Sequence, residues 1–245
     1  MSCTPCAVPA RIPAIPIAAF RAQIEEILFH EALRNMYEVP GIDVPGTDNI
    51  RFNRAYYLRH RIETVRRVRM TARTDALALA AMIDEDYEAA RRWAKYTVEE
   101  MQHDRLFLAD LAQHGWDTLR VLATPPLAGT VALVNYLTRQ IALRGGIAAV
   151  AYSILVEWNS ARFSRHLVDR AEQEFGKEFV KGSRAHLHID AEEDHLAEMV
   201  GIAYLLVNRA DSMQILRCLL VDIAALLRDS FIELHHITSD AGAVA

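Results

Sequence analysis

Apolar residues recur at three- and four-residue spacing along almost the whole chain after residue 16, and runs of alternating β-branched residues are missing. This is the period of helices with one buried face, whereas half-buried strands need a two-residue period. The pattern predicts an all-α fold, a single bundle of about seven helices. The expected helices cover about 17–36, 49–72, a separate short one at 74–82, then 87–114, 127–143, 147–174, 177–208 and 212–236.

One domain is expected, because a chain of 245 residues that is 52% hydrophobic can bury a sizeable core. We expect a flexible Pro-rich leader at 1–16, a helical domain at 17–238 and a flexible tail at 239–245. Cys3 and Cys6 form a lone Cys-x-x-Cys among the prolines of the leader, where disordered chain is favoured over a zinc or redox site. Three cysteines build no disulfide framework and fit a reducing compartment.

The charge pattern argues against large anionic partners. The formal net charge is -5, and acidic and basic residues are interspersed, so we expect no nucleic acid and no membrane surface as partner. The longest apolar run, 145–156, is too short to cross a bilayer, and the N-terminus lacks the pattern of a secretory signal. A cytoplasmic homodimer that binds a small-molecule substrate is the expectation.

Two helical segments combine carboxylates with histidines at spacings that suit a metal. Glu100 and His103 are three residues apart, and His188, Glu192 and His195 follow the spacing of four and three. Residues separated by three, four or seven positions share one face of an α-helix, so each set should converge. Glu-x-x-His alone is weak evidence, since the chain contains it three times, but His-x-x-x-Glu-x-x-His is much rarer.

Two further carboxylates complete the ligand set of a two-metal helical bundle, which takes a lone Glu from each of two helices and Glu-x-x-His from each of two others. Glu157 lies in an apolar helix, where an unpartnered carboxylate is costly. Glu63 is the candidate for the second lone Glu, although the neighbouring arginines offer salt bridges instead. Glu99 could replace Glu100. Solvated faces or core positions are preferred for His60, His166, His186, Asp190, Glu193 and Asp194.

Imidazole and carboxylate ligands without thiolate suit iron or manganese, and iron is the first choice. Two iron ions (Fe2+/Fe3+) would take O2 as co-substrate, with an electron donor as external reductant. The predicted function is therefore that of an oxygenase or oxidase.

These motifs, across about residues 50–205, resemble two enzyme families. In the haem-oxygenase-like di-iron oxidases, the third ligand helix reads His, three residues, Asp, two residues, His; the segment 188–195 is similar but has Glu192 at the middle position. The ferritin-like arylamine N-oxygenases have a lone Glu, Glu-x-x-His, a lone Glu and His-x-x-x-Glu-x-x-His. The order Glu63, Glu100, His103, Glu157, His188, Glu192, His195 resembles theirs. Length and helix number favour the haem-oxygenase-like fold, with a ferritin-like four-helix core as the alternative.

The resemblance implies N-oxygenation of an amine in secondary metabolism, with oxidative carbon–carbon cleavage or decarboxylation of a fatty acid or amino acid as the rival. In these families an extra carboxylate ligand accompanies N-oxygenation, which makes Glu63 the discriminating residue. Tyr96 lies one turn before Glu100, and Arg184 one turn before His188, so both are candidates for the substrate cavity. Arg184 could hold a substrate carboxylate or form an ordinary salt bridge.

Other classes of protein remain as alternatives. An iron-storage protein would use similar ligands but should have no cavity beyond the metals. A haem-binding bundle could use His30 as its axial ligand, although that leaves His188, Glu192 and His195 without a role. A purely structural bundle would bind no metal.

Overall fold

The computed structural model describes residues 14–41, 45, 50–208 and 210–239, with the backbone alone at 191–193 and 210–211. Within these ranges the regular elements are all helices, which confirms the predicted all-α class. In chain order they are α1 (Ile17–Glu38), α2 (Arg54–Glu85), α3 (Tyr87–Gln113), α4 (Thr118–Ala123), α5 (Ala128–Arg144), α6 (Ile147–Asn159), a π-helical turn (Ser160–Ser164), α7 (Arg165–Phe175), a 3-10 turn (Lys177–Phe179), α8 (Lys181–Glu193), α9 (His195–Leu206) and α10 (Ala210–Ser239).

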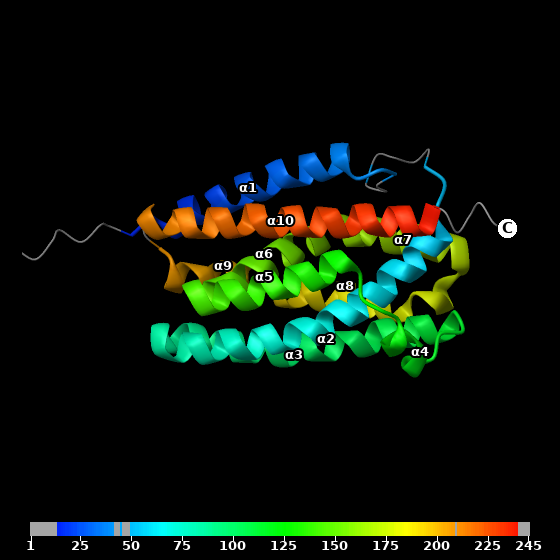
Figure 1. Ribbon diagram of the computed structural model, residues 1–245, viewed down its shortest axis with the longest axis horizontal. Coiled ribbons are helices and arrows are strands. Elements are labelled where there is room, and N and C mark those ends of the chain that lie inside the picture. Colours follow the sequence, from blue (N-terminus) through cyan, green and yellow to red (C-terminus); the bar gives the residue numbers. More distant parts are fainter. Residues whose placement is uncertain (1–13, 42–44, 46–49, 209, 240–245) are drawn as a thin grey trace, which may run out of the picture.

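The helices form an elongated bundle around α6. In Figure 1, α1 lies along α10 at one edge, α2 and α3 lie side by side at the opposite edge, and α5, α6, α8 and α9 fill the layer between them. Almost every residue of α6 is buried, from Ile147 to Trp158. A helix that is apolar on all sides belongs in the centre of a protein, and the burial of α6 follows from its sequence.

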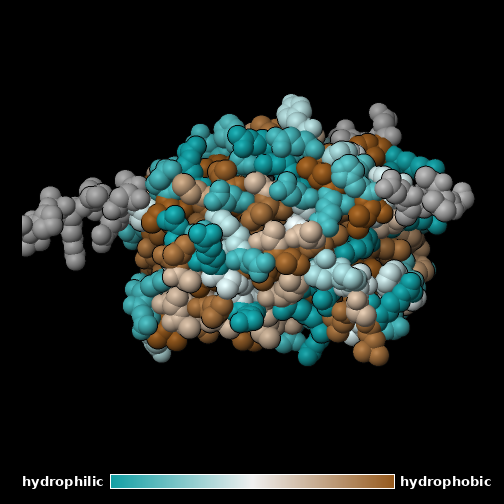
Figure 2. Space-filling view, in the orientation of Figure 1, coloured by the Kyte–Doolittle hydropathy of each residue, from teal (hydrophilic) through white to brown (hydrophobic). Residues whose placement is uncertain are grey.

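The surface carries hydrophilic side chains interspersed with hydrophobic ones over the face seen in Figure 2. Among the described residues, no helix is long and apolar enough to span a membrane. The leader and tail expected at 1–16 and 239–245 lie mostly outside the described residues, so their predicted flexibility stays a prediction.

Helix boundaries differ most from the predictions at three places, and the short helix α4 was not expected. One helix, α2, runs through the break expected after residue 72, where the sequence has neither glycine nor proline. The helix expected at 147–174 contains the π-helical turn, and the helix expected at 177–208 is interrupted at Asp194. Asp194 has φ of 43°, the left-handed conformation that aspartate tolerates better than most residues, and its side chain accepts a hydrogen bond from Ala197 N. These last two irregularities determine which side chains meet.

The start of α8 is fixed by Asp110 of α3. Its buried carboxylate accepts hydrogen bonds from the backbone N–H groups of Gly182 and Ser183 at 2.7 Å each, and from the Ser183 hydroxyl at 2.8 Å. A side-chain Cβ at position 182 would collide with the carbonyl oxygen of Leu106, so only glycine allows this close approach of α8 to α3.

Replacing Asp110 with Ala should therefore lower the free energy of unfolding by about 3 kcal/mol, because it leaves two buried N–H groups without an acceptor. Urea denaturation of the metal-free protein measures the change. Asp117→Ala is the matched control: Asp117 caps α4 at an exposed position, and its loss should cost about 1 kcal/mol. Equal losses in the two variants would contradict this role of Asp110.

Candidate metal centre

Six side chains that commonly bind metals form two adjacent groups inside the bundle. His103, His186 and Asp190 make up the first group, and Glu100, Glu157 and His195 make up the second. Within each group the potential ligand atoms lie within 4.8 Å of one another. The residues come from α3, α6, α8 and α9, so four helices converge on one place.

The two groups are in contact. Glu100 Oε1 lies 3.2 Å from His103 Nδ1, and Asp190 Oδ1 lies 3.8 Å from His195 Nδ1. Each carboxylate thus belongs to one group and reaches toward the other. Such an arrangement can hold two cations close together with carboxylates shared between them.

Neighbouring polar groups orient the potential ligands. The Tyr96 hydroxyl donates a hydrogen bond to Glu157 Oε1 at 2.8 Å, and the Ser160 hydroxyl donates one to Asp190 Oδ2 at 2.9 Å. Glu99 Oε2 lies 3.7 Å from His195 Nε2, on the ring nitrogen opposite the one that faces the cluster. A carboxylate on the far nitrogen of a histidine is the usual support for a metal-bound imidazole.

The π-helical turn explains the position of Ser160. It follows Glu157 by three residues and widens the helix at the point where Ser160 meets Asp190 of α8. Single π-turns inside α-helices are rare and often mark functional sites. The left-handed Asp194 likewise affects the position of His195, because α9 begins at His195 directly after it.

Charge is crowded in this interior. Burial raises the pKa of Glu157 well above its usual range, and the nearby carboxylates of Glu100 and Asp190 add to the effect. Burial acts to lower the pKa of His103, but the contact with Glu100 and the surrounding carboxylates outweigh it, so this pKa is raised. Burial acts to raise the pKa of Asp190, but the hydrogen bond and charge of His186 prevail and lower it. A bound cation would offset the repulsion among these carboxylates.

Three buried atoms of the cluster support a metal more directly. Within the described part of the chain, Glu100 Oε1, His103 Nδ1 and Asp190 Oδ1 are enclosed and make no hydrogen bond of acceptable geometry. Buried polar atoms without partners are uncommon and costly. Since all three are atoms that bind cations, and no thiolate is among the six side chains, the site fits iron or manganese.

The cluster opens onto a cavity of about 380 Å³ between α2, α3, α6, the π-helical turn, α8 and α10. Glu100, His103, Glu157 and His186 form part of its wall, and most other lining residues are apolar or aromatic. This volume is within the range of small-molecule sites. A small organic molecule in the cavity would lie against the cluster.

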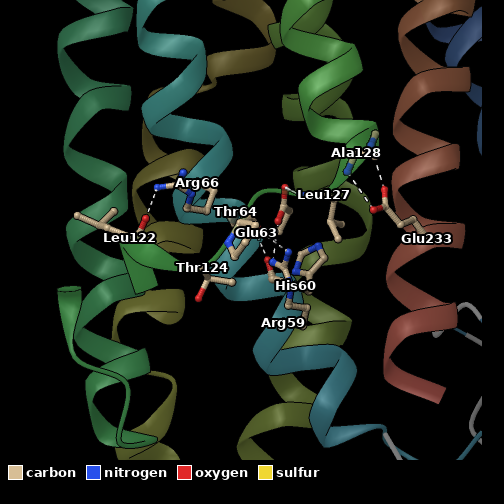
Figure 3. Close-up of polar contacts among 12 residues, drawn as sticks. Arg59, His60, Glu63, Thr64, Arg66, Leu122, Thr124, Leu127, Ala128 and Glu233 are labelled. Atoms are coloured by element: carbon tan, nitrogen blue, oxygen red, sulfur yellow. Dashed lines mark hydrogen bonds and ion pairs between the residues drawn. The ribbon is translucent and has the colours of Figure 1, made fainter. Parts of the chain in front are cut away.

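Glu63 does not join the cluster. Its buried carboxylate forms an ion pair with Arg59 Nη1 at 2.7 Å and accepts a hydrogen bond from Leu127 N at 3.0 Å, as Figure 3 shows. Glu233 of α10 accepts from Ala128 N and Gly129 N in the same region. The first turn of α5 has no capping side chain of its own, and carboxylates from other helices satisfy its N–H groups. The prediction of Glu63 as a ligand is thus corrected: this carboxylate serves the N-terminus of α5.

On α8 the structure brings His186 and Asp190 into the cluster, whereas the predicted ligand His188 is not part of it. His188 is exposed. The side chain of Glu192 lies outside the described residues. Two residues correspond to about 200° of rotation around a helix, so a face that contains His186 excludes His188. The sequence did contain a signal, since His186 and Asp190 match the His-x-x-x-Asp of the haem-oxygenase-like di-iron pattern, with two extra residues before His195.

The remaining candidates separate clearly. Glu100, His103, Glu157 and His195 lie in the cluster, and Tyr96 lines the cavity. Glu99, the alternative to Glu100, contacts His195 from outside. Arg184 is engaged elsewhere: its guanidinium lies 2.6 Å from Asp169 Oδ1 and 2.7 Å from Glu172 Oε2, and it is not among the residues around the cavity. Arg184 therefore forms the salt bridge that the sequence left open.

Comparison with known proteins identifies structures of similar fold. No protein-family model matches the sequence, and no curated protein is significantly similar to it. Among solved structures, a domain of unknown function with a haem-oxygenase-like fold from Shewanella denitrificans has a TM-score of 0.74 at 18% identity, covering 94% of this chain and 97% of that one. The chain has a haem-oxygenase-like fold. A TenA homologue from Pseudomonas syringae pv. tomato is also similar, with a TM-score of 0.66 at 16% identity over 92% of this chain and 97% of that one.

The haem-oxygenase-like fold confirms the predicted architecture, and the ferritin-like four-helix core is not the one adopted. Within this fold, the cluster of histidines and carboxylates is a candidate metal site.

Proposed function

We propose that this protein is a non-haem di-iron oxygenase that oxidises a small organic substrate in the cavity beside the cluster. The proposal rests on one observation above all: two adjacent groups of three ligand side chains converge from four helices at the wall of a small-molecule cavity. A storage protein would need no cavity beside its metals. His30 is exposed on α1 and does not line the cavity, which gives no support to haem ligation.

The six side chains divide the task of holding the metals. His103, His186 and Asp190 would hold one iron ion, and Glu100, Glu157 and His195 the other. Two histidines with one carboxylate are the ligand set of many iron sites that react with oxygen. When bound, the pair of iron ions would activate O2 with electrons from an external donor.

Two residues beside the cluster can hold protons. Tyr96 keeps its proton, because burial and the charge of Glu157 raise the pKa of its hydroxyl well above the usual value, and it donates that proton in a hydrogen bond to Glu157. Asp75 of α2 also lines the cavity, where burial and the charge of Glu100 raise the pKa of its carboxyl to about 7. A carboxyl with this pKa can give or accept a proton at neutral pH.

The position of Glu63 bears on the reaction. An extra carboxylate at the metals is the feature that accompanies N-oxygenation in the resembling families, and Glu63 instead caps α5. This shifts the expectation from N-oxygenation of an amine toward oxidative carbon–carbon cleavage, and product analysis separates the two.

The proposal predicts that anaerobic titration with ferrous iron gives two ions per chain, and that exposure of the loaded protein to oxygen with a reductant gives rapid O2 uptake. Zinc-loaded protein is the control, because zinc has no redox chemistry and should give no uptake. Mass spectrometry after incubation with a panel of amines, amino acids and fatty acids would show either a gain of oxygen on nitrogen or a shortened carbon chain. Failure to bind iron stoichiometrically would overturn the assignment.

A further inference from the structure

Arg61 of α2 is a buried cation that has no counter-ion among the described residues. Its side chain is 5% exposed and lines the cavity. In the part of the chain that the structure describes, its guanidinium forms no ion pair or hydrogen bond, and its Nε is enclosed without a partner. Its guanidinium carbon lies over the faces of Tyr57 and Phe107, 5.2 Å from each ring centroid.

Three other arginines of α2 have a carboxylate beside them. Arg54, Arg59 and Arg69 form ion pairs, with Glu174, Glu63 and Asp104 respectively. These pairs satisfy their guanidinium groups within the protein. An unpaired charge in the interior costs several kcal/mol, so a buried arginine normally has an anion beside it.

The charge of Arg61 acts on its neighbour His60. Arg67 also lines the cavity. Burial lowers the pKa of His60 well below its usual value, and the charges of Arg61 and Arg67 lower it further. His60 therefore stays neutral at pH 7 and adds no positive charge.

The distance between Arg61 and the metal cluster is short. Phe107 contacts Arg61 on α2 and also packs against the His186 ring, with 5.0 Å between ring centroids. A substrate of modest length can thus reach from the guanidinium to the cluster, and the aromatic and apolar residues that line the cavity suit a hydrocarbon body.

We propose that Arg61 is the anion-recognition residue of the cavity, and that the substrate carries a carboxylate which pairs with its guanidinium. The planar guanidinium can bind both oxygens of a carboxylate at once. That the bound carboxylate is also a substrate rests on the proposed function. The binding of a carboxylate at Arg61 itself requires no metal.

The test measures binding to metal-free protein by isothermal titration calorimetry. The probes are 3-phenylpropionate, 3-phenylpropan-1-ol and 3-phenylpropylamine, which share one hydrocarbon body and differ in the head group. Wild type should bind the acid about 30-fold or more tightly than the alcohol or the amine, as expected for a desolvated charge pair. Arg61→Met should lose this preference, and Arg61→Lys should keep only part of it. Arg184→Met is the matched control, because Arg184 pairs with Asp169 and Glu172 and should leave the preference intact.

Thermal unfolding distinguishes recognition from a structural role. Without ligand, Arg61→Met should melt no lower than wild type, since it removes an uncompensated buried charge. A lower melting temperature for Arg61→Met would identify Arg61 as a structural residue and overturn the proposal. Equal binding of acid and alcohol by wild type, or no binding of either, would also overturn it. If the acid preference holds but wild type binds no iron, the anion site stands and the di-iron assignment fails.

Discussion

Replacing His186 with Ala should weaken iron binding by at least about 100-fold, whereas replacing His188 with Ala should leave iron binding unchanged. His186 belongs to the cluster with His103 and Asp190, and His188 is exposed on the same helix two residues later. Even the loss of a group that only supports a metal ligand costs about 10- to 100-fold in affinity, so the loss of a ligand should cost no less.

The measurement is equilibrium titration of each variant with ferrous iron under anaerobic conditions, with metal content determined after gel filtration. The pair is well matched, because both substitutions remove an imidazole from α8 and both leave a good helix former. Circular dichroism should show the same helix content in both variants. The opposite order of effects would mean that the face of α8 chosen from the sequence pattern, with His188 and Glu192, is the one that binds metal.

A smaller part of the site than of the fold could be predicted from the sequence. The apolar period identified the helices because burial of one face decides helix formation over many residues. The apolar sequence around Glu157 identified this residue as a carboxylate that needs a partner. Glu100 and His103 share a face of one uninterrupted helix, and the structure brings them together as that spacing predicts.

The predicted ligands on α8 differ from the observed cluster because spacing rules assume an unbroken helix. Counting back from His195 in an unbroken helix selects His188 and Glu192. The left-handed Asp194 interrupts the helix, so residues of α8 no longer share a face with His195 at the spacing of three and seven. Aspartate adopts this conformation and caps helices more readily than glutamate, but one aspartate in an acidic stretch does not by itself show that a helix is interrupted there. Glu63 illustrates a second limit: a buried carboxylate can bind a cation or cap a helix N-terminus, and only the tertiary structure shows which.

Replacing Glu157 with Gln should stabilise the metal-free protein at pH 8 while it weakens iron binding. Burial and the charges of Glu100 and Asp190 raise the pKa of Glu157, so the folded state retains a proton that the unfolded chain releases above about pH 4.5. Glu157 thus reduces stability progressively as the pH rises above that value, and the effect vanishes below it, where both states are protonated. Glutamine has no proton to lose, and its carbonyl oxygen can still accept the hydrogen bond from Tyr96.

Melting temperatures of metal-free wild type and Glu157→Gln between pH 4 and pH 8 provide the measurement. The two should coincide near pH 4, and the variant should melt at least about 3 °C higher at pH 8, since 1 kcal/mol corresponds to about 2–4 °C for a chain of this size. Glu63→Gln is the control, because it breaks a buried ion pair with Arg59 and should lower the melting temperature at pH 8. A lower melting temperature for Glu157→Gln at pH 8 would mean that this carboxylate is already compensated within the protein. We thus expect the variant to be more stable than wild type without metal but to bind iron more weakly. This is the behaviour of a residue that favours a bound cation and lowers the stability of the metal-free protein.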